Sequence, residues 1–393
     1  MTAAIAAIVP TRNRAELAMR AVRSLLDQDC EIDIYLSDNS ASPDALRDYC
    51  AKRRRVTWLR PPRELSMPEH WEWAIGEAMA RSPATHFTLH YDRKASKPRH
   101  WGELQRLASR NPDLLITFAN DQISHHPPPL RLWQAPWTGK MFRLATATVA
   151  ALIAQSRIME VLHAVPALSN CLIPRTVLET ISGRFGSVCS STGPDSAFLW
   201  RFLALHERYL HYDRAPGVVY ASHRSNGLGY LRGTGGDFAD YRKTFGERPW
   251  LDLAPLPGVN LGQNMLYHEH ERVRRETGDR LPPLDRAAAI ADLGRHLAMI
   301  EDPEGKAELR RLLAAEGWAG READPPPAPT PEAKEWEREQ RFRMRWFGKA
   351  PPTITGFSFR DDKEALRYAM RFPRAPQPSA GHLDVLGAVE IAQ

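Results

Sequence analysis

The chain has few cysteines, and their positions argue against two kinds of protein. Of its 393 residues only four are cysteine, namely Cys30, Cys50, Cys171 and Cys189. No two of them have the close spacing of a zinc site, and four in so long a chain do not make the disulfide framework of a small secreted domain. The sequence therefore predicts free, reduced thiols, as is usual in the cytosol.

Long apolar runs are absent as well. The longest, Leu144–Ala154, is too short for a helix that crosses a bilayer, which needs about 20 residues. The first residues lack the basic segment and the cleavage site of a secretory signal. We therefore expect a cytoplasmic protein with no transmembrane segment, and leave open a peripheral attachment to the inner face of the membrane.

Two ligand-binding signatures are also missing. No Gly-x-Gly-x-x-Gly follows the first predicted strand, where Pro10-Thr11-Arg12-Asn13 stands instead, and this excludes an NAD-type oxidoreductase. The net charge is +6, but no recognised nucleic-acid-binding motif accompanies it. We therefore expect no nucleic-acid partner.

What the sequence does contain is a regular alternation of two patterns over its first 121 residues. Apolar runs typical of buried strands occupy Ala3–Val9, Ile32–Leu36, Val56–Leu59, His86–Leu89 and Leu114–Phe118. Between them, apolar residues recur at helical spacing in Ala15–Leu26, Pro43–Arg54, Glu69–Arg81 and Pro98–Arg110. Strands separated by helices of this length predict a parallel sheet covered by helices, in the α/β class.

After residue 121 the alternation ends. We expect helices over Met141–Ile158, Arg175–Ile181 and Ala197–Leu205, an extended Ser169–Ile173, and one or two strands in Tyr209–Tyr220. A glycine-rich segment, residues 227–236, is either a loop that closes over a ligand or a plain surface loop. Residues 260–318 have the pattern of helices throughout.

These patterns predict a division of the chain into four segments. Residues 1–230 would form one domain with two halves, 1–121 and 122–230. Residues 231–320 would add a helical extension. A proline-rich linker, 321–334, would then lead to a C-terminal tail segment, 335–393.

Polar residues follow the ends of the predicted strands. Thr11 and Asn13 follow the first strand, Asp38 and Asn39 the second, and Asp92 the fourth. Because ligands of open α/β sheets bind beyond the carboxyl ends of the strands, this edge is where we expect the functional site.

Over roughly residues 3–225 the motifs resemble, in order and spacing, the family 2 glycosyltransferases of the GT-A fold. Ile8–Arg14 is similar to that family's first strand and turn, and Ser37–Ser40 to the end of its second strand. Residues 85–113 are similar to the fourth strand, the metal-binding turn and the next helix, and Asn170–Asp195 to the acceptor-side segment. The resemblance implies a Rossmann-like nucleotide-diphospho-sugar transferase sandwich, followed here by the helical C-terminal extension.

The resemblance also implies an activity, in which a sugar passes from a nucleotide-diphosphate donor to an acceptor hydroxyl with inversion. The donor would be a UDP-sugar, the acceptor a glycan or a small molecule, and the setting polysaccharide biosynthesis by a hexosyltransferase. Asp195 matches the family's general base, which takes the proton of the attacking hydroxyl. Its other interpretation is a helix cap, since it opens an apolar helix.

Seven residues match positions that bind the nucleotide sugar in the family. His70 stands where many members have an asparagine. Asp38 would accept hydrogen bonds from the base or the ribose, and its other interpretation is a turn-forming aspartate before Asn39-Ser40. The full set is Pro10, Thr11, Arg12, Asp38, His70, Asp92 and Arg93.

The metal turn departs from the family pattern. Instead of Asp-x-Asp it reads His90-Tyr91-Asp92-Arg93-Lys94, so that only Asp92 can ligate a metal. One carboxylate can hold Mg²⁺ or Mn²⁺ when phosphates and waters complete the shell. Alternatively Arg93 or Lys94 neutralises the diphosphate without metal, or donor binding is weakened or lost.

Two further hypotheses stay open. His223 and Arg224 are possible diphosphate contacts, or simply an exposed pair beside the glycine-rich loop. The incomplete metal turn also permits a non-catalytic GT-A-like binding or scaffold protein. In either case the helical C-terminal part could pair subunits into a homo-oligomer.

Overall fold

A computed structural model describes residues 4–125, 130–189, 192–221, 251–300, 303–320, 359–371, 374–377 and 379–391. The glycine-rich segment, His223, Arg224 and the predicted linker lie outside this part of the chain. None of the helices described is long and apolar enough to cross a membrane.

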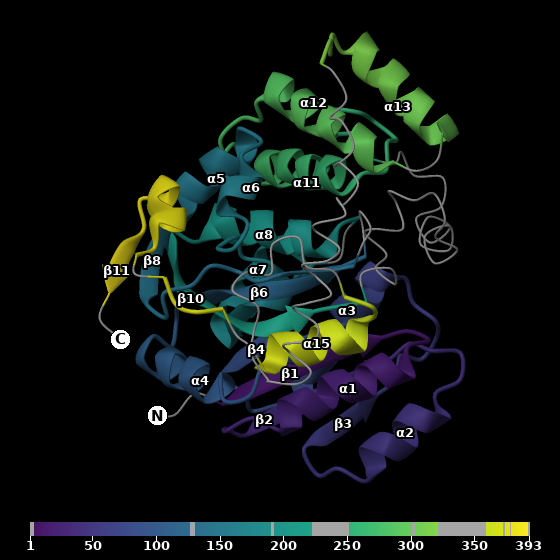
Figure 1. Cartoon of the computed structure of the whole chain (residues 1–393), viewed down its shortest axis with the longest axis vertical. Coiled ribbons are helices and arrows are strands. Elements are labelled where there is room, and N and C mark those ends of the chain that lie inside the picture. Colours follow the sequence, from purple (N-terminus) through teal and green to yellow (C-terminus); the bar gives the residue numbers. More distant parts are fainter. Residues whose placement is uncertain are drawn as a thin grey trace, which may run out of the picture.

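A sheet of eleven strands runs through the described structure (Figure 1), in the order β11-β8-β10-β6-β9-β4-β1-β2-β3, while β5 pairs with β10 and β7 with β6. The strands are β1 (Ile5–Thr11), β2 (Ile32–Asp38), β3 (Val56–Leu59), β4 (His86–Leu89), β5 (Lys94–Ser96), β6 (Ile116–Ser124), β7 (Arg131–Trp133), β8 (Met141–Ala145), β9 (Cys171–Pro174), β10 (Arg208–Val219) and β11 (Val389–Ile391). The strands β3, β2, β1 and β4 are parallel neighbours, and β6 runs parallel to β10. Antiparallel β9 joins β4 to β6.

The predicted α/β class, with parallel strands covered by helices, is confirmed in the N-terminal part. The helices there are α1 (Ala15–Leu26), α2 (Asp44–Ala51), α3 (Met67–Arg81) and α4 (Trp101–Arg110). They alternate with β1 to β4 and β6 as the sequence pattern indicates, although β6 extends well beyond the predicted end at Phe118.

The core lies on both faces of this sheet, which explains why β1 is apolar at nearly every position. Ala6 and Ile8 of β1 pack into one cluster with α3, α7 (Arg175–Phe185) and α8 (Pro194–Leu205). Ile5 and Val9 pack into the other, with α1, α2 and α4. The parallel strands are therefore covered by helices on each side.

The expected helix over Met141–Ile158 is wrong in its first part. The segment begins with β8, in which Met141, Phe142 and Leu144 are buried and Arg143 is exposed. Only then follow α5 (Thr146–Ala154) and the short α6 (Ile158–Val161). The neighbours that make β8 a strand are β10 and β11, which lie about 65 and 245 residues further along the chain. A pattern read within a short window of sequence cannot reveal partners so far away.

The described residues of the segment 260–318 include several helices, and a separate helical extension stays a prediction. The segment forms α11 (Gly262–Glu276), α12 (Arg286–Arg295), the 3₁₀ turn η3 (His296–Met299) and α13 (Pro303–Ala315), at the top of Figure 1. The indole of Trp200 in α8 donates to the carbonyl of Leu266 in α11, 2.9 Å away, and fixes this group to the rest. The division of the chain into domains stays a prediction.

The C-terminal part returns to the sheet, where its elements have the yellow colours in Figure 1. Helix α15 (Asp362–Arg371) contributes Ala365, Tyr368 and Ala369 to a cluster that contains Leu17 of α1. The 3₁₀ turn η4 (Gly381–Leu386) leads to β11 at the edge of the sheet.

Gly217 of β10 provides a test of this packing. A Cβ atom at Gly217 would lie 2.6 Å from Cε of the buried Lys94 and 2.9 Å from Oδ1 of Asn120. We expect Gly217→Ala to lower the free energy of unfolding by about 1–3 kcal/mol, as overpacking does. Gly183→Ala in α7, where nothing lies within 4 Å, should instead raise it by about 0.5–1 kcal/mol. Urea denaturation of both variants measures this, and an unchanged Gly217→Ala protein would contradict it.

Candidate active site

The carboxyl ends of β1, β2 and β4 meet at one edge of the sheet. Thr11 and Asp38 are opposite each other in the β1–β2 register. The backbone N–H of His90, just after β4, donates to the carbonyl of Ile8, 2.7 Å away. Side chains that follow these three strands therefore lie close together, as the strand-end argument predicts.

Asp38 has an acceptor atom with no hydrogen bond to a described residue. Its side chain is fully buried, and Oδ1 accepts from the backbone N–H of Ser40 at 2.9 Å. Oδ2 is shielded from solvent and makes no hydrogen bond with the described residues. Because a buried carboxylate oxygen without a donor costs free energy, a ligand N–H or O–H at this point would be strongly favoured.

The loops after β1 and β2 are fixed to each other. Asn13, which has a positive φ of 55°, donates its backbone N–H to Ser40 Oγ at 2.8 Å and accepts from the N–H of Ala41 at 3.1 Å. Arg60 donates to the carbonyls of Asp38 and Ser40. This network holds the backbone around Asp38 in place before any ligand arrives.

Three other predicted residues lie beside this edge. Pro10 is buried in β1, and the half-exposed Arg12 forms an ion pair with Glu64. Nε2 of His70 lies 2.7 Å from Ser37 Oγ. Burial, with the nearby charges of Arg12 and Arg60, lowers the pKa of His70 to about 4. His70 is therefore neutral at pH 7, and its ring contacts Ser37 near the end of β2.

Asp92 lies between hydrogen-bond and charge partners. Its Oδ2 accepts from Thr11 Oγ1 at 2.9 Å, and its Oδ1 is 3.6 Å from Nη1 of Arg14. Burial lowers the pKa of Arg93, and the charge of Asp92 partly offsets this effect. Arg93 is therefore also close to Asp92. A single carboxylate is thus accompanied by two guanidinium groups.

The charges around Asp92 favour an anion over a divalent metal ion, because its neighbours include the cations Arg14 and Arg93. Asp92 alone would hold Mg²⁺ or Mn²⁺ only with phosphates and waters as the other ligands. In the part of the chain that the structure describes, no group of three or more His, Cys, Asp or Glu side chains could hold a metal. The same guanidinium groups are suited to bind phosphate oxygens.

Asp195 lies in the first turn of α8 and faces the turn after β4. The hydroxyl of Tyr91 donates a hydrogen bond to its Oδ2, and its Oδ1 is shielded from solvent. Burial raises the pKa of Asp195, while Tyr91, the backbone N–H groups of Leu168 and Ser169, and Arg93 lower it, so that the net shift is upward. The carboxylate makes no hydrogen bond to an N–H group of α8 among the described residues, so its partners differ from those of a helix cap.

Lys94 is placed differently from Arg93. Its side chain is 1% exposed, and Nζ donates to the carbonyl of Ser169 at 2.7 Å. Burial lowers its pKa to about 7. The amine therefore lies in the interior, where it donates to the segment beside Asp195, and its role as a diphosphate contact stays a prediction.

Two residues that sequence reasoning did not select also position Asp195. Tyr91 supplies the hydrogen bond and packs on Trp71, with ring centroids 5.5 Å apart. Glu72 accepts the backbone N–H groups of Val188 and Cys189 at 2.8 and 2.7 Å, which holds the segment before α8. In the sequence, Tyr91 could have been noticed as an aromatic residue next to Asp92, whereas Glu72 looks like any charged residue of a helix.

No protein-family model and no curated protein matches the chain. It is similar to a solved structure of TarS 1-349 from S. aureus, with 12% identity and a TM-score of 0.43 over 78% of this chain and 83% of that one. The same TarS fragment in complex with UDP-GlcNAc gives 11% identity and a TM-score of 0.42, covering 78% and 83% of the two chains. Its complex with UDP gives 12% and 0.42, covering 79% and 86%. Likeness at this level carries no argument about the function of this chain.

The raised pKa of Asp195 makes a prediction about stability. Since the folded-state pKa lies above the ordinary value of 3.8, the protonated form is favoured on folding. Stability is therefore lost as the pH rises through the folded-state pKa. Asp195→Asn, which cannot ionise, should be more stable than the wild type at about pH 7, and this difference should vanish near about pH 3.

Thermal denaturation of the two proteins between these pH values measures the effect. Asp33→Asn, the same substitution at an exposed position of β2, is the control. A less stable Asp195→Asn protein at neutral pH would contradict the account.

Proposed function

We propose that the protein is an inverting glycosyltransferase that moves a sugar from a nucleotide-diphosphate donor, a UDP-sugar in the first instance, to an acceptor hydroxyl. The observation that carries the proposal is the arrangement of Asp38, Asp92 and Asp195 at one edge of the sheet. Asp38 has a shielded oxygen without a hydrogen bond, Asp92 is accompanied by guanidinium groups, and Asp195 has a raised pKa. The resemblance of the motifs to family 2 glycosyltransferases agrees with these roles.

In this proposal Asp38 recognises the nucleoside. A uracil ring offers one N–H donor, and the ribose offers hydroxyl donors. Oδ2 of Asp38 is a buried acceptor that lacks a hydrogen bond, so either donor would satisfy it. The fixed loops around Asn13 and Ser40 mean that little conformational entropy is lost when the base binds.

Arg93 and Arg14 would neutralise the diphosphate. The leaving group carries negative charge that must be stabilised in the transition state, and guanidinium groups can do so without a metal ion. Asp92 holds these two side chains electrostatically, while Thr11 fixes Asp92. Metal independence is accordingly part of the proposal.

Asp195 would act as the general base. It takes the proton of the acceptor hydroxyl as the hydroxyl oxygen attacks the anomeric carbon from the face opposite the leaving diphosphate, which inverts that centre. A raised pKa makes the carboxylate a stronger base. The hydroxyl of Tyr91 orients it. The transferred unit is proposed to be a hexose, and the acceptor a glycan or a small molecule, as in polysaccharide biosynthesis.

The second candidate is a non-catalytic binding protein of the same fold. The single carboxylate at the former metal turn favours it, because that turn has lost a catalytic ligand of the resembled family. The two candidates differ in one respect: only the enzyme needs Asp195 for turnover. A homo-oligomer through α11 to α13 stays a prediction under both.

The first test is nucleotide binding. Isothermal titration calorimetry with UDP should show binding that excess EDTA leaves unchanged, since arginines and not a metal neutralise the diphosphate. Asp38→Ala should weaken it by about tenfold or more, the loss expected for a buried charge-assisted hydrogen bond. Asp33→Ala on the exposed side of β2 should bind as the wild type does. Binding that requires Mn²⁺, or that survives Asp38→Ala, would contradict the assigned roles.

The second test is turnover. With a panel of UDP-, GDP- and dTDP-sugars, release of the nucleoside diphosphate should fall by at least about 10²-fold in Asp195→Asn, in the range of a lost general base. UDP affinity should be retained in that variant. Tyr91→Phe should retain part of the activity, with an altered pH profile. Tight UDP binding with no turnover in the wild type for any sugar would favour the binding protein.

A further inference from the structure

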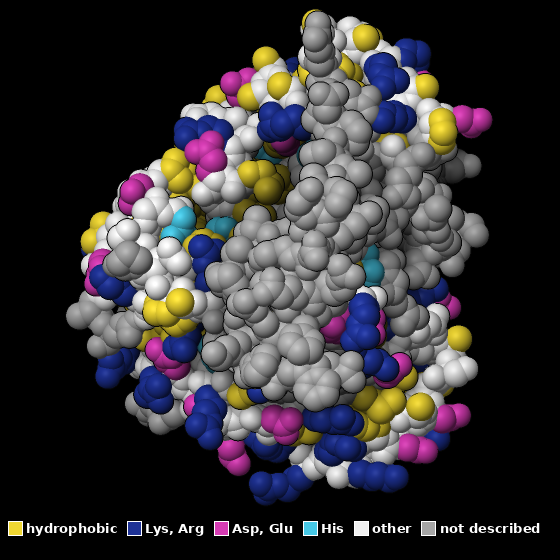
Figure 2. All heavy atoms as spheres, in the orientation of Figure 1, with side chains coloured by type: hydrophobic (Ala, Val, Ile, Leu, Met, Phe, Trp, Pro, Cys, Tyr) yellow, Lys and Arg dark blue, Asp and Glu magenta, His cyan; other side chains and the backbone are white. Residues whose placement is uncertain are grey.

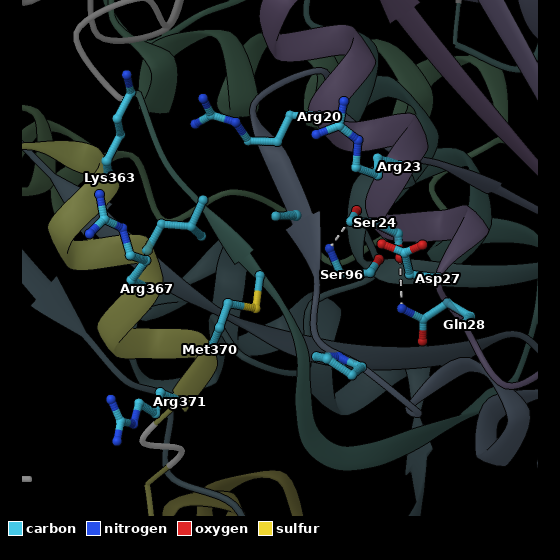
Figure 3. Close-up of a pocket in the computed structure, with 13 residues that line it drawn as sticks. Arg20, Arg23, Ser24, Asp27, Gln28, Ser96, Lys363, Arg367, Met370 and Arg371 are labelled. Carbon is cyan, nitrogen blue, oxygen red and sulfur yellow. Dashed lines mark hydrogen bonds between the residues drawn. The ribbon is translucent and has the colours of Figure 1, made fainter. Parts of the chain in front are cut away.

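A separate pocket lies between α1 and α15, about 540 Å³ in volume. Its walls are formed by α1, by the segment from β5 toward α4, and by α15. None of the residues assigned to the nucleotide sugar lines it. Figure 3 shows Arg20 extending from α1 toward α15, and Met370 pointing into the space between the two helices. A volume of this size is in the range of small-molecule sites.

Cationic side chains dominate the lining. The lining contains one carboxylate, that of Asp27, and five cations, namely Arg20, Arg23, Lys363, Arg367 and Arg371. The three on α15 follow one another at intervals of four residues, which places them on one side of that helix. Figure 2 shows further Lys and Arg side chains along the lower rim of the molecule, where α1 and α2 lie in Figure 1.

Some of these charges already have a partner in the described structure, and others make no ion pair or hydrogen bond there. Arg20 pairs with Glu16 at 3.2 Å and lies over the ring of Tyr220. No ion pair or hydrogen bond joins the side chains of Arg23, Lys363 or Arg367 to a described residue. These three side chains are exposed at the pocket, and an anion between the two helices would be attracted by charges on both of them.

The neutral polar groups of the lining are already occupied. Ser24 Oγ donates to the carbonyl of Ala21 and accepts from the N–H of Ser96. Ser96 Oγ is bonded to the ring nitrogens of His90 and Trp101. These hydroxyls are therefore not available to bind the hydroxyls of a neutral sugar.

The rest of the lining is apolar, formed by Ala95, Pro98, Leu366 and Met370. A fully hydrophilic anion would leave this surface without a partner, whereas a hydrocarbon group would cover it. Guanidinium groups in turn bind phosphate oxygens in a bidentate manner. The preferred ligand thus combines a phosphate with an apolar group.

From this arrangement we infer that the pocket between α1 and α15 is a second binding site, which takes the phosphate ester of a hydrocarbon. The phosphate lies among Arg23, Lys363 and Arg367, and the hydrocarbon lies on Leu366 and Met370. The ligand is either a soluble organic phosphate or the headgroup region of an anionic phospholipid, which share this chemistry.

The experiment uses the full chain and three soluble probes, namely hexyl phosphate, inorganic phosphate and hexanol. Calorimetry should show that hexyl phosphate binds more tightly than either of the others. Arg23→Ala/Arg367→Ala should weaken hexyl phosphate binding by about tenfold or more, because two charge-assisted hydrogen bonds are lost. Met370→Ser should reduce the preference for hexyl phosphate over inorganic phosphate. The control Arg106→Ala/Arg110→Ala, at exposed positions of α4, removes the same charge elsewhere. It should change neither the affinity for hexyl phosphate nor its preference over inorganic phosphate.

A second arm distinguishes the two sources. Co-sedimentation with phosphatidylcholine vesicles, with and without phosphatidic acid, should depend on phosphatidic acid and on Arg23 and Arg367 if the ligand is a lipid. Binding of hexyl phosphate without vesicle binding assigns a soluble ligand. Absence of binding in both arms, or equal binding by the pocket variant and the α4 control when both are folded by circular dichroism, overturns the inference.

Discussion

The hydrogen bond from Tyr91 to Asp195 joins two segments that are far apart in the sequence. Tyr91 lies two residues after β4, and Asp195 lies in the first turn of α8, 104 residues later. Lys94 and Glu72 hold the backbone that precedes Asp195, through the carbonyl of Ser169 and the N–H groups of Val188 and Cys189. The position of the proposed base relative to Asp92 depends on these contacts.

The edge of the sheet is built at a cost to stability. Asp38 has a buried oxygen without a hydrogen bond, and the pKa of Asp195 is raised by burial. Arg93, also largely enclosed, has a lowered pKa for the same reason. Charged groups that are poorly satisfied in the free protein are typical of functional sites, where a ligand or a transition state completes them. The burial of the apolar core on both faces of the sheet offsets this loss of stability.

The sequence alone predicted the parallel strands and their helices well, because each was signalled by its own periodicity. Val56–Leu59 and His86–Leu89 were predicted with the bounds that the structure has. It failed at β8, whose strand partners lie far along the chain, and it did not find β5, which is only three residues long. For the site, strand ends pointed to Asp38 and Asp92, but no local pattern could show that Lys94 is buried or that Tyr91 reaches Asp195. Those facts depend on contacts between segments, which a one-dimensional pattern does not contain.

The most direct test of the central claim is a crystal structure of the wild-type protein with UDP. The account predicts the uracil or the ribose within hydrogen-bonding distance of Asp38 Oδ2. It also predicts the diphosphate beside Arg93 and Arg14, with Asp195 open to the space beyond the β-phosphate. UDP bound elsewhere on the protein, or a diphosphate held by a metal ion that displaces the arginines, would contradict it.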